Sequence, residues 1–216
     1  MKKFELELDS LKNRLLEMGS VAERMVARAS EALVRRDRAI VADVLADEEV
    51  LDRMQIQIDG EAVRLITVYT PTAKDLRFLL MVVRINTELE RIGDQAVNNC
   101  EYVEMFLSDP PARPMHDLSR MTDIACEMVH GALAAFATED VEMAKRVVAL
   151  DDQVDALNRQ TFTDLIADRT NDPELVKRSM SLILLASSIE RIADHAENIC
   201  EEVVFLVKGE DIRNQA

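Results

Sequence analysis

The sequence predicts an all-α protein made of two tandem, similar three-helix bundles, with six long helices in total. The first observation behind this prediction is the small number of turn residues, since only five Gly and five Pro occur in 216 residues. The second is the aromatic content of 4%, because β-strands are rich in aromatic and β-branched side chains. The third is an internal repeat, which sets the domain organisation.

The repeat is centred on two acidic segments of nearly the same sequence, ERIGD at 90–94 and ERIAD at 190–194. Matches at the same offset follow downstream; they are Asn98 with Asn198, Cys100 with Cys200, and Glu101 with Glu201. Upstream, Asp52 matches Asp155 with an offset of 103. The difference in offset falls in a turn, where changes of length are tolerated. The repeat therefore predicts two similar halves with an approximate twofold relation.

Apolar residues recur at steps of three and four along most of the chain, which is the helical period. They predict six helices, over residues 9–36, 37–69, 71–107, 116–138, 139–169 and 173–208, with a turn at 170–173 before the sixth. Asp9 or Ser10 is expected to cap the first helix and Thr138 the fifth. Gly209 is expected to end the sixth helix.

Prolines mark two breaks between these helices. Thr70 precedes Pro71 and is pushed out of the helical region, so it is expected to end the second helix. The segment SDPPARPMHD holds three of the five prolines of the chain and is the predicted linker between the halves. The first repeat is therefore expected over 1–108 and the second over 115–209.

The charge of the chain restricts its partners. The formal net charge is −15, from 41 acidic and 26 basic residues, so the chain as a whole repels polyanions such as DNA and RNA. We therefore expect cations, metal ions or locally basic proteins as partners, and no nucleic acid. Three scattered cysteines do not make a disulfide framework or a zinc site. No secretory segment or membrane span is visible, which predicts a reduced, soluble, cytoplasmic protein.

The acidic segments place oxygen-bearing side chains on one face of each predicted helix. With about 100° per residue, this face carries Glu90, Asp94, Asn98 and Glu101 in the first repeat, and Glu190, Asp194, Asn198 and Glu201 in the second, where Glu197 joins it. The opposite side carries an apolar stripe, which consists of Ile85, Leu89, Ile92, Ala96 and Val103, and of Leu185, Ile189, Ile192, Ala196 and Val203. The carboxylates are therefore expected on an outer face or a seam, and not in the deepest interior.

Carboxylates at positions i and i+4 of a helix repel one another, and no lysine lies in the same stripe. The face therefore requires a counter-charge, which a cation with oxygen ligands would supply, such as Mg²⁺, Ca²⁺, Mn²⁺ or iron. Acids of the preceding helices can complete the coordination; these are Asp47, Glu48 and Asp52, and Asp151, Asp152 and Asp155. A solvated acidic face without metal is the alternative that the spacing leaves open.

Other motifs carry weaker functional signals. Glu127 and His130 have the E-x-x-H spacing of ferritin-like di-iron sites, but those sites require two such motifs, so surface side chains are expected here. His195 lies about 100° from the acidic face, which indicates a surface or boundary residue at its edge. Cys100 and Cys200 are interpreted as small buried residues. The sequence contains no Gly-rich phosphate loop and no nucleophile beside a base.

The paired acidic motifs, in the forms LERIGD and IERIAD, resemble those of the PhoU family, the phosphate-transport regulatory proteins of bacteria. The segment PTAKDLR, from Pro71 to Arg77, is similar to the P-x-A-x-D-L-R sequence that opens the family's third helix. The second repeat departs from this form, with ELVKR after Pro173. The length, the six helices and the duplication agree with the family over nearly the whole chain.

The resemblance implies a fold of two similar three-helix bundles. Some members bind multinuclear iron or zinc clusters on the two E-x-x-x-D faces, which points here to Glu90, Asp94, Glu190 and Asp194. It also implies a negative regulator of the phosphate-starvation response, which links the ATPase subunit of the phosphate ABC transporter to a membrane sensor histidine kinase. Such a protein is expected to be a homodimer, to meet the membrane only through its partners and not to be an enzyme. A di-metal carboxylate enzyme, an oxidase or a hydrolase, is the alternative.

Overall fold

The structure, a computed structural model, describes residues 2–108, 116–167 and 172–209. These residues form six α-helices, which are α1 Lys2–Arg35, α2 Arg38–Tyr69, α3 Ala73–Ser108, α4 His116–Thr138, α5 Val141–Ala167 and α6 Pro173–Lys208. No β-strand occurs within the described ranges. The prediction of an all-α chain with six long helices is therefore confirmed.

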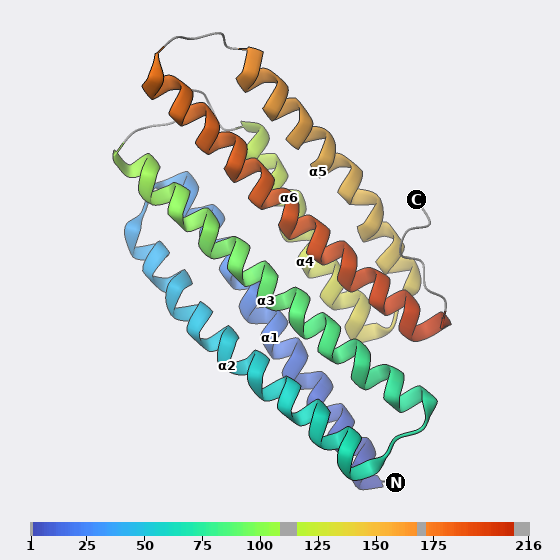
Figure 1. The fold of residues 1–216 in the computed structure, drawn as a ribbon. Coiled ribbons are helices and arrows are strands. Elements are labelled where there is room, and N and C mark those ends of the chain that lie inside the picture. Colours follow the sequence, from blue (N-terminus) through green and yellow to red (C-terminus); the bar gives the residue numbers. More distant parts are fainter. Residues whose placement is uncertain (1, 109–115, 168–171, 210–216) are drawn as a thin grey trace.

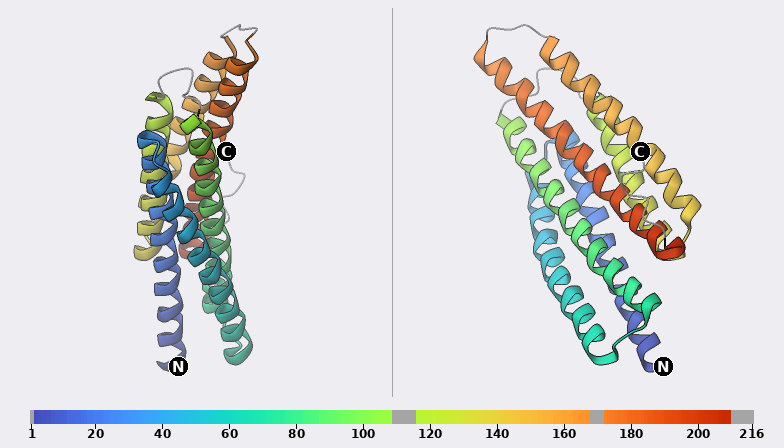
Figure 2. Two further views of the ribbon diagram at one scale, coloured as in Figure 1. Left: turned by 90° about the vertical axis from the view of Figure 1, so that its left-hand side faces the viewer. Right: turned by 45° about the vertical axis from the view of Figure 1, so that its right-hand side comes forward.

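The helices form two three-helix bundles that share a contact surface. Within each bundle, α1–α3 and α4–α6, every helix packs against both of the others. The bundles meet through α3 against α6 and through α1 against α4. Figure 1 shows α2 and α5 at opposite edges, with α3 and α6 side by side between them. The side views of Figure 2 show α1 and α4 behind this layer. Four helices, two from each half, therefore form the centre of the molecule.

The helices α3 and α6 run antiparallel, and we call their contact the seam (Figure 1). Side-chain contacts along the seam pair Arg84 with Glu202, Glu88 with His195, Gln95 with Ser188 and Met105 with Ser181. Positions 88 and 188 are equivalent in the repeat, and so are positions 95 and 195. The Glu88–His195 and Ser188–Gln95 contacts are thus two forms of one contact, related by the approximate twofold axis that the repeat predicts.

The two predicted apolar stripes of α3 and α6 lie in the core, as expected. Each of their residues is at most 1% exposed, and Cys100 and Cys200 are buried as well. They belong to one hydrophobic cluster that includes buried residues of all six helices. The cluster continues from one bundle to the other, since Gly19 of α1 packs against Leu133 of α4. Burial of this shared apolar surface is the main force that holds the two bundles together.

Gly93, inside the first acidic segment, sets the distance between α2 and α3. A methyl group at this position would overlap the side chain of Leu51 on α2, so the absence of a side chain allows this close packing. The second repeat has Ala193 at the equivalent position and Val154 where the first repeat has Leu51. A larger residue on one helix thus accompanies a smaller residue on the other, and all four are buried.

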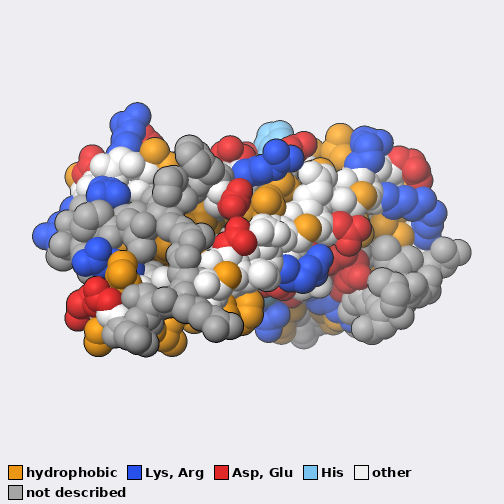
Figure 3. Space-filling view, turned by 90° about the horizontal axis from the view of Figure 1, so that it is seen from above, with side chains coloured by type: hydrophobic (Ala, Val, Ile, Leu, Met, Phe, Trp, Pro, Cys, Tyr) orange, Lys and Arg blue, Asp and Glu red, His pale blue; other side chains and the backbone are white. Residues whose placement is uncertain are grey.

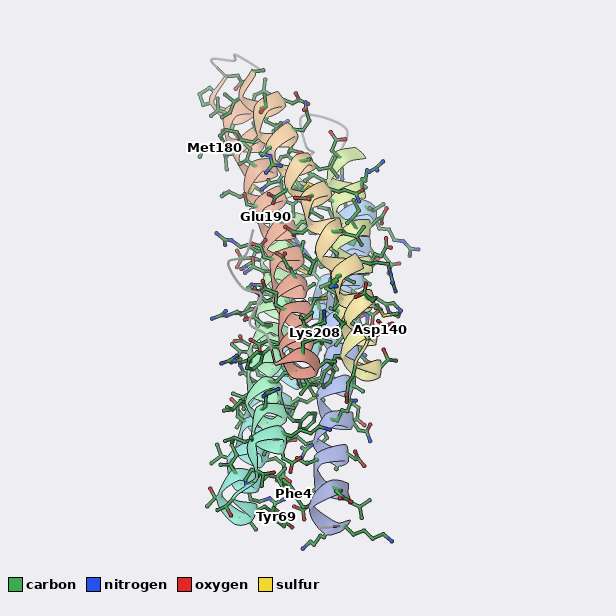
Figure 4. All side chains as sticks on the ribbon, turned by 90° about the vertical axis from the view of Figure 1, so that its right-hand side faces the viewer. Phe4, Tyr69, Asp140, Met180, Glu190 and Lys208 are labelled. Carbon is green, nitrogen blue, oxygen red and sulfur yellow. The ribbon has the colours of Figure 1, made fainter. Side chains whose placement is uncertain are left out.

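The first helix is longer than predicted, because it begins at Lys2 and not near Asp9. The additional turns have their own packing partners. The ring of Phe4 lies 4.6 Å from that of Tyr69 at the end of α2 (Figure 4), and Glu7 accepts a hydrogen bond of 2.6 Å from Arg64. Tertiary contacts with α2 therefore stabilise the first turns of α1, which the local sequence pattern did not predict.

The predicted cap of the fifth helix is also wrong. The carboxylate of Asp140 accepts hydrogen bonds from the backbone amides of Glu142 and Met143, at 2.9 and 3.0 Å, and so caps α5. The hydroxyl of Thr138 donates instead to the carbonyl of Ala134 within α4, at 2.8 Å. Aspartate is among the best N-capping residues because its oxygens reach the unpaired amides of the first turn.

Other predicted helix ends are confirmed. Thr70 ends α2 in a left-handed conformation with φ 44°, and Gly209 ends α6 with φ 71°. Asp172 caps α6 by accepting from the amide of Glu174, at 3.0 Å. The proline-rich linker at 109–115 and the predicted end of the fifth helix at Arg169 lie outside the described residues.

Candidate functional site

The first acidic face brings together carboxylates of α2 and α3. Glu90 and Glu48 are partly buried, whereas Asp94 and Asp52 are exposed. Partial burial raises the pKa of Glu90, and the charges of Asp94 and Asp52 raise it further. Desolvation of the carboxylate and the charge of Asp52 raise the pKa of Asp94, although the residue as a whole is exposed. Burial and the charges of Asp52 and Asp94 raise the pKa of Glu48. These four carboxylates repel one another, so they form one electrostatic cluster.

The second acidic face repeats this arrangement between α5 and α6. Glu190 and Asp194 of α6 are partly buried, and so are Asp151 and Asp155 of α5. Burial, followed by the charges of Asp194 and Asp155, raises the pKa of Asp151 to about 6. The same effects raise the pKa of Glu190 and Asp194 above their ordinary values. The prediction that the carboxylates line an outer face and not the core is confirmed for both repeats.

The two faces are not identical. Glu197 of α6 stands where α3 has Val97, and burial together with Asp151 and Glu201 raises its pKa to about 7. One oxygen of Asp151, Oδ1, is buried and has no hydrogen-bond partner among the described residues. The second face therefore holds more negative charge, with poorer solvation, than the first.

The two asparagines of the predicted faces turn towards the seam. The amide of Asn198 donates to Glu88 Oε2 at 3.1 Å, and that of Asn98 lies 3.4 Å from Gln95 Oε1. Glu101 is exposed, and Glu201 is partly buried. The helical wheel thus placed these residues on the correct side of the helices, but Asn98 and Asn198 already have amide partners at the seam.

Glu88 is the residue of this region that the sequence did not single out. Its carboxylate Oε2 lies 2.8 Å from His195 Nδ1, and its Oε1 accepts from Arg91 at 3.2 Å. Burial acts to raise the pKa of Glu88, but hydrogen bonds from His195 and Asn198 hold it below its ordinary value. His195 is therefore a boundary residue that joins the two repeats, which agrees with its predicted place beside the acidic face.

A cavity of about 310 Å³ opens along the seam next to Glu88. Its lining consists of Arg84, Thr87, Glu88, Arg91, Asn198, Glu201 and Glu202. Arg84 donates to both carboxylate oxygens of Glu202 at 3.1 Å, and the guanidinium lies 5.8 Å from the centre of the Phe205 ring. These polar groups bond to one another across the cavity. The cavity therefore lies at a contact between the repeats whose polar groups already have partners.

Asp47, which was expected to face the acidic segment, faces α1 instead. It accepts hydrogen bonds from Arg24 at 2.8 and 2.9 Å and from Arg28 at 2.7 Å. These guanidinium groups, Arg24 first, hold the pKa of Asp47 below its ordinary value against the effect of burial. His130 of the E-x-x-H motif lies on the surface, as expected, and pairs with Glu23 of α1 at 2.9 Å.

Across the described residues, no three His, Cys, Asp or Glu side chains converge closely enough to hold a metal ion. No helix of this part of the chain is long and apolar enough to cross a membrane. The arrangement is a pair of acidic faces, one on α2 and α3 and one on α5 and α6, on either side of the seam. Such faces attract cations and repel anions.

The family model described as "PhoU domain" matches residues 15–103 and again residues 118–203. The chain belongs to the PhoU domain family. Each match covers one three-helix bundle, and each contains one acidic segment. The internal repeat in the sequence is therefore a repeat of this domain.

Relatives resemble the chain over nearly its whole length. The "Phosphate-specific transport system accessory protein PhoU homolog" of Aquifex aeolicus is 34% identical over 100% of this chain and 97% of its own. The homologue of the same name from Pseudomonas putida is 32% identical over 98% of this chain and 83% of its own. These are names of accessory proteins and not of enzymes, and they do not favour the di-metal enzyme.

Solved structures of the PhoU family share the fold. The "Crystal structure of PhoU from Pseudomonas aeruginosa" has a TM-score of 0.91 and 31% identity, and covers 96% of this chain and 100% of its own. The "Crystal structure of the phosphate transport system regulatory protein PhoU from Streptococcus pneumoniae" has a TM-score of 0.88 and 25% identity, with coverages of 96% and 98%. The prediction of the family and of its two helical bundles is confirmed.

The structure also gives a reason for the PTAKDLR segment of the first repeat. The guanidinium of its last residue, Arg77, lies 5.5 Å from the centre of the Phe205 ring. It also borders Gly209, where a Cβ would come within 2.9 Å of Arg77 Nη1. This motif therefore begins α3 and at the same time holds the end of α6, next to the carbonyl groups that a cation stabilises.

Proposed function

We propose that this chain is a negative regulator of phosphate uptake and of the phosphate-starvation response. In this role it acts in the cytoplasm as a homodimeric adaptor between the ATPase subunit of the phosphate ABC transporter and a sensor histidine kinase. It reaches the membrane only through these partners. The observation that carries the proposal is the match of both bundles to the PhoU domain, together with relatives named as accessory proteins of phosphate-specific transport.

Deletion of the gene tests this regulatory role. We expect genes of the phosphate-starvation response to be expressed at high phosphate in the deletion strain, and repression to return when the intact gene is supplied. A transporter-ATPase pull-down with the purified chain, at high and at low phosphate, tests the adaptor role directly. Normal repression in the deletion strain would contradict the regulatory proposal, and the absence of ATPase and kinase from the pull-down would contradict the adaptor.

We further propose that the two acidic faces bind metal cations. The donor chemistry fits, because carboxylate oxygens suit hard cations such as Mg²⁺, Mn²⁺ or iron, and mutual repulsion within each face favours a counter-charge. The buried Oδ1 of Asp151, which has no hydrogen-bond partner in the part of the chain that the structure describes, adds an available ligand atom in the second face. Because the side chains do not converge on one point, binding requires rotation of side chains. A bound cation would supply positive charge that offsets this repulsion.

The ligands proposed for the first face are Glu90 and Asp94 with Glu48 and Asp52, and those for the second are Glu190 and Asp194 with Asp151, Asp155 and Glu197. The identity of the metal, whether a multinuclear iron or zinc cluster or Mn, Mg or Ca, is the object of the test. Glu101 and Glu201 are candidates at the edge of each face. Asn98 and Asn198 are weaker candidates, because their amides have partners at the seam.

Elemental analysis of purified protein tests metal binding. The variant with Asp94→Ala and Asp194→Ala is compared with wild type and with Asp43→Ala, which removes an exposed acid of α2 outside both faces. We expect the double variant to lose bound metal while Asp43→Ala retains it. Equal metal content in all three proteins would contradict the assignment of the faces.

A further inference from the structure

The second repeat exposes a group of large apolar side chains where α5 ends and α6 begins. The residues are Phe162 and Ile166 of α5, which are 49% and 56% exposed, and Val176, Met180 and Leu184 of α6, which are 42%, 58% and 52% exposed. We call this group the apolar patch. Steps of four residues place the members of each helix along one side of it. Exposed apolar patches of this kind mark interaction sites on soluble proteins.

A surface hollow lies between the packed helices α5 and α6, and we call the surface along it the groove. Its lining consists of Asn158, Arg159, Phe162 and Thr163 of α5 and Ser187 of α6, and Arg159 forms an ion pair with Asp155 of the second acidic face at 2.8 Å. Hydrophobic side chains are visible among the charged ones in the view from above (Figure 3). Phe162 therefore joins the apolar patch to a hollow whose other lining side chains are polar.

The same groove is acidic at its other end. On α6, Met180, Ser187 and Asp194 follow one another at steps of seven residues, so they share one side of the helix. Figure 4 labels Met180 near the start of α6 and Glu190 further along the same helix. On α5, Asp151 and Asp155 precede Phe162 by two to three turns. The apolar patch thus continues into the second acidic face.

The first repeat does not offer the same surface. Leu184 of the patch has Arg84 as its equivalent in α3, and Arg84 forms an ion pair with Glu202 across the seam. Leu80 is the equivalent of Met180 and is exposed, but Phe162 has no aromatic counterpart at 59 or 62 in α2. Val63, the equivalent of Ile166, is exposed as well, so the first repeat has part of the apolar patch but lacks counterparts of Phe162 and Leu184.

Electrostatics decides what can cover this groove. A second copy of the chain that met this groove with its own second acidic face would place two sets of mutually repelling carboxylates against each other. An anionic membrane surface meets the same repulsion. A partner segment with apolar side chains in one half and Lys or Arg in the other complements both halves of the groove.

We propose that the groove between α5 and α6 is a docking surface for a cationic amphipathic helix of a partner protein. The distance along α6 from Val176 to Glu197 is roughly 30 Å, which corresponds to a partner helix of about 20 residues. Its apolar half covers the patch, and its basic half lies against the second acidic face. This inference rests on the adaptor role proposed above, since it names the chemistry of one partner.

Site-specific photo-crosslinking in cells tests the occupant of the groove. Met180→benzoylphenylalanine is compared with Val34→benzoylphenylalanine, which places the same group at an exposed apolar position of α1. Mass spectrometry then identifies the peptide that is joined to each. We expect position 180 to capture an amphipathic segment of another protein with net positive charge.

Four results would overturn the proposal: a crosslink from position 180 to a second copy of this chain, to lipid, to an acidic or non-amphipathic segment, or no product above the Val34 control.

The captured segment is next synthesised and its affinity for the full chain is measured by fluorescence anisotropy, in the presence of a chelator. Because two large anchors are lost, Phe162→Ser with Met180→Ser is expected to weaken binding at least about tenfold.

The control for this measurement is Val34→Ser with Ile56→Ser, which removes two exposed apolar residues of the first repeat and is expected to change the affinity less than about twofold. Increasing salt is expected to weaken binding, because screening removes the charge attraction. Equal weakening by both double variants would contradict the role of the apolar patch in binding.

If the ATPase binds wild type and the variant with Phe162→Ser and Met180→Ser equally, the proposed docking surface is wrong while the adaptor role stands. If neither the ATPase nor the kinase binds wild type, the adaptor role fails by itself.

Discussion

Glu88 of α3 and His195 of α6 join the two PhoU domains at the seam, with 2.8 Å between Glu88 Oε2 and His195 Nδ1. The equivalent contact on the other side of the twofold axis joins two uncharged groups, since the hydroxyl of Ser188 donates to Gln95 Oε1 at 3.0 Å. Repeat duplication has therefore kept the geometry of the contact and changed its chemistry. The polar centre of the seam now depends mainly on one carboxylate.

Glu88→Ala is expected to destabilise the protein more than Ser188→Ala. The first substitution removes the acceptor for His195, Asn198 and Arg91, and leaving such groups without a partner costs about 1–3 kcal/mol. The second removes one neutral hydrogen bond, at about 1 kcal/mol. Calorimetry should show the larger fall in Tm for Glu88→Ala, and Glu88→Gln, which retains an acceptor oxygen, should recover part of it. Equal effects at positions 88 and 188 would contradict the dominance of Glu88.

Gly93→Ala is expected to destabilise the protein although alanine favours helices by about 1 kcal/mol over glycine. The reason is the overlap with Leu51, for which overpacking costs about 1–3 kcal/mol. Adding Leu51→Val recreates the Ala193 and Val154 combination of the second repeat, and should recover stability. Urea unfolding of the two single variants and the double variant measures the coupling free energy.

The control for this series is Gly60→Ala, because Gly60 has open space around its Cα and no atom within 4 Å of an added Cβ. It is expected to stabilise the protein by about 1 kcal/mol through helix propensity alone. Strict additivity of the changes at positions 93 and 51 would show that the two residues do not set the distance between α2 and α3.

Glu197→Gln is expected to stabilise the metal-free protein at high pH. Folding raises the pKa of Glu197 from 4.5 to about 7 through burial and neighbouring carboxylates. The folded state therefore binds more protons than the unfolded state between these values, and the free energy of unfolding falls as pH rises through this window. For a group that is half exposed, solvent screening leaves about 1 kcal/mol, or about 3 °C in Tm.

Thermal unfolding with a chelator, at pH 4.5 and at pH 8, checks the sign. The gain from Glu197→Gln should be present at pH 8 and absent at pH 4.5, where the unfolded-state group is half protonated and the folded-state group is neutral. Glu49→Gln, at an exposed position of α2, is the control. A gain of the same size at both pH values would argue against charge repulsion as its cause.

Asp140→Ala is expected to lower the stability by about 1 kcal/mol, because the first two free amides of α5 lose their acceptor. Thr138→Ala should change the stability by less than about 0.5 kcal/mol, because the hydroxyl of Thr138 donates only to a backbone carbonyl within α4. Circular dichroism during thermal unfolding distinguishes the two. A larger loss of stability for Thr138→Ala than for Asp140→Ala would contradict the assignment of Asp140 as the N-cap of α5.

Much of the candidate site follows from local sequence. The positions of Glu90 and Asp94, and of Glu190 and Asp194, on the side of the helix away from the core required only helical periodicity and the repeat. The pairing of Asp47 with α1 did not follow, because Arg24 and Arg28 are distant in sequence and periodicity does not say which neighbouring helix a side chain meets. Glu88 was missed for the same reason, since its partners His195 and Asn198 come from the other repeat.

The sequence alone determined the six helices, the duplication, the acidic faces and the family, because each of these depends on spacing along a single helix or on the comparison of two segments. The tertiary structure decided where α1 begins, that Asp140 caps α5, and that Asn98 and Asn198 turn towards the seam. It also brought Phe162 and Ile166 of α5 to the same end of the second bundle as Val176 and Met180 of α6, where they form the apolar patch. These features depend on how separate helices pack, and the free energy of such packing is set by surfaces that meet only in the folded chain.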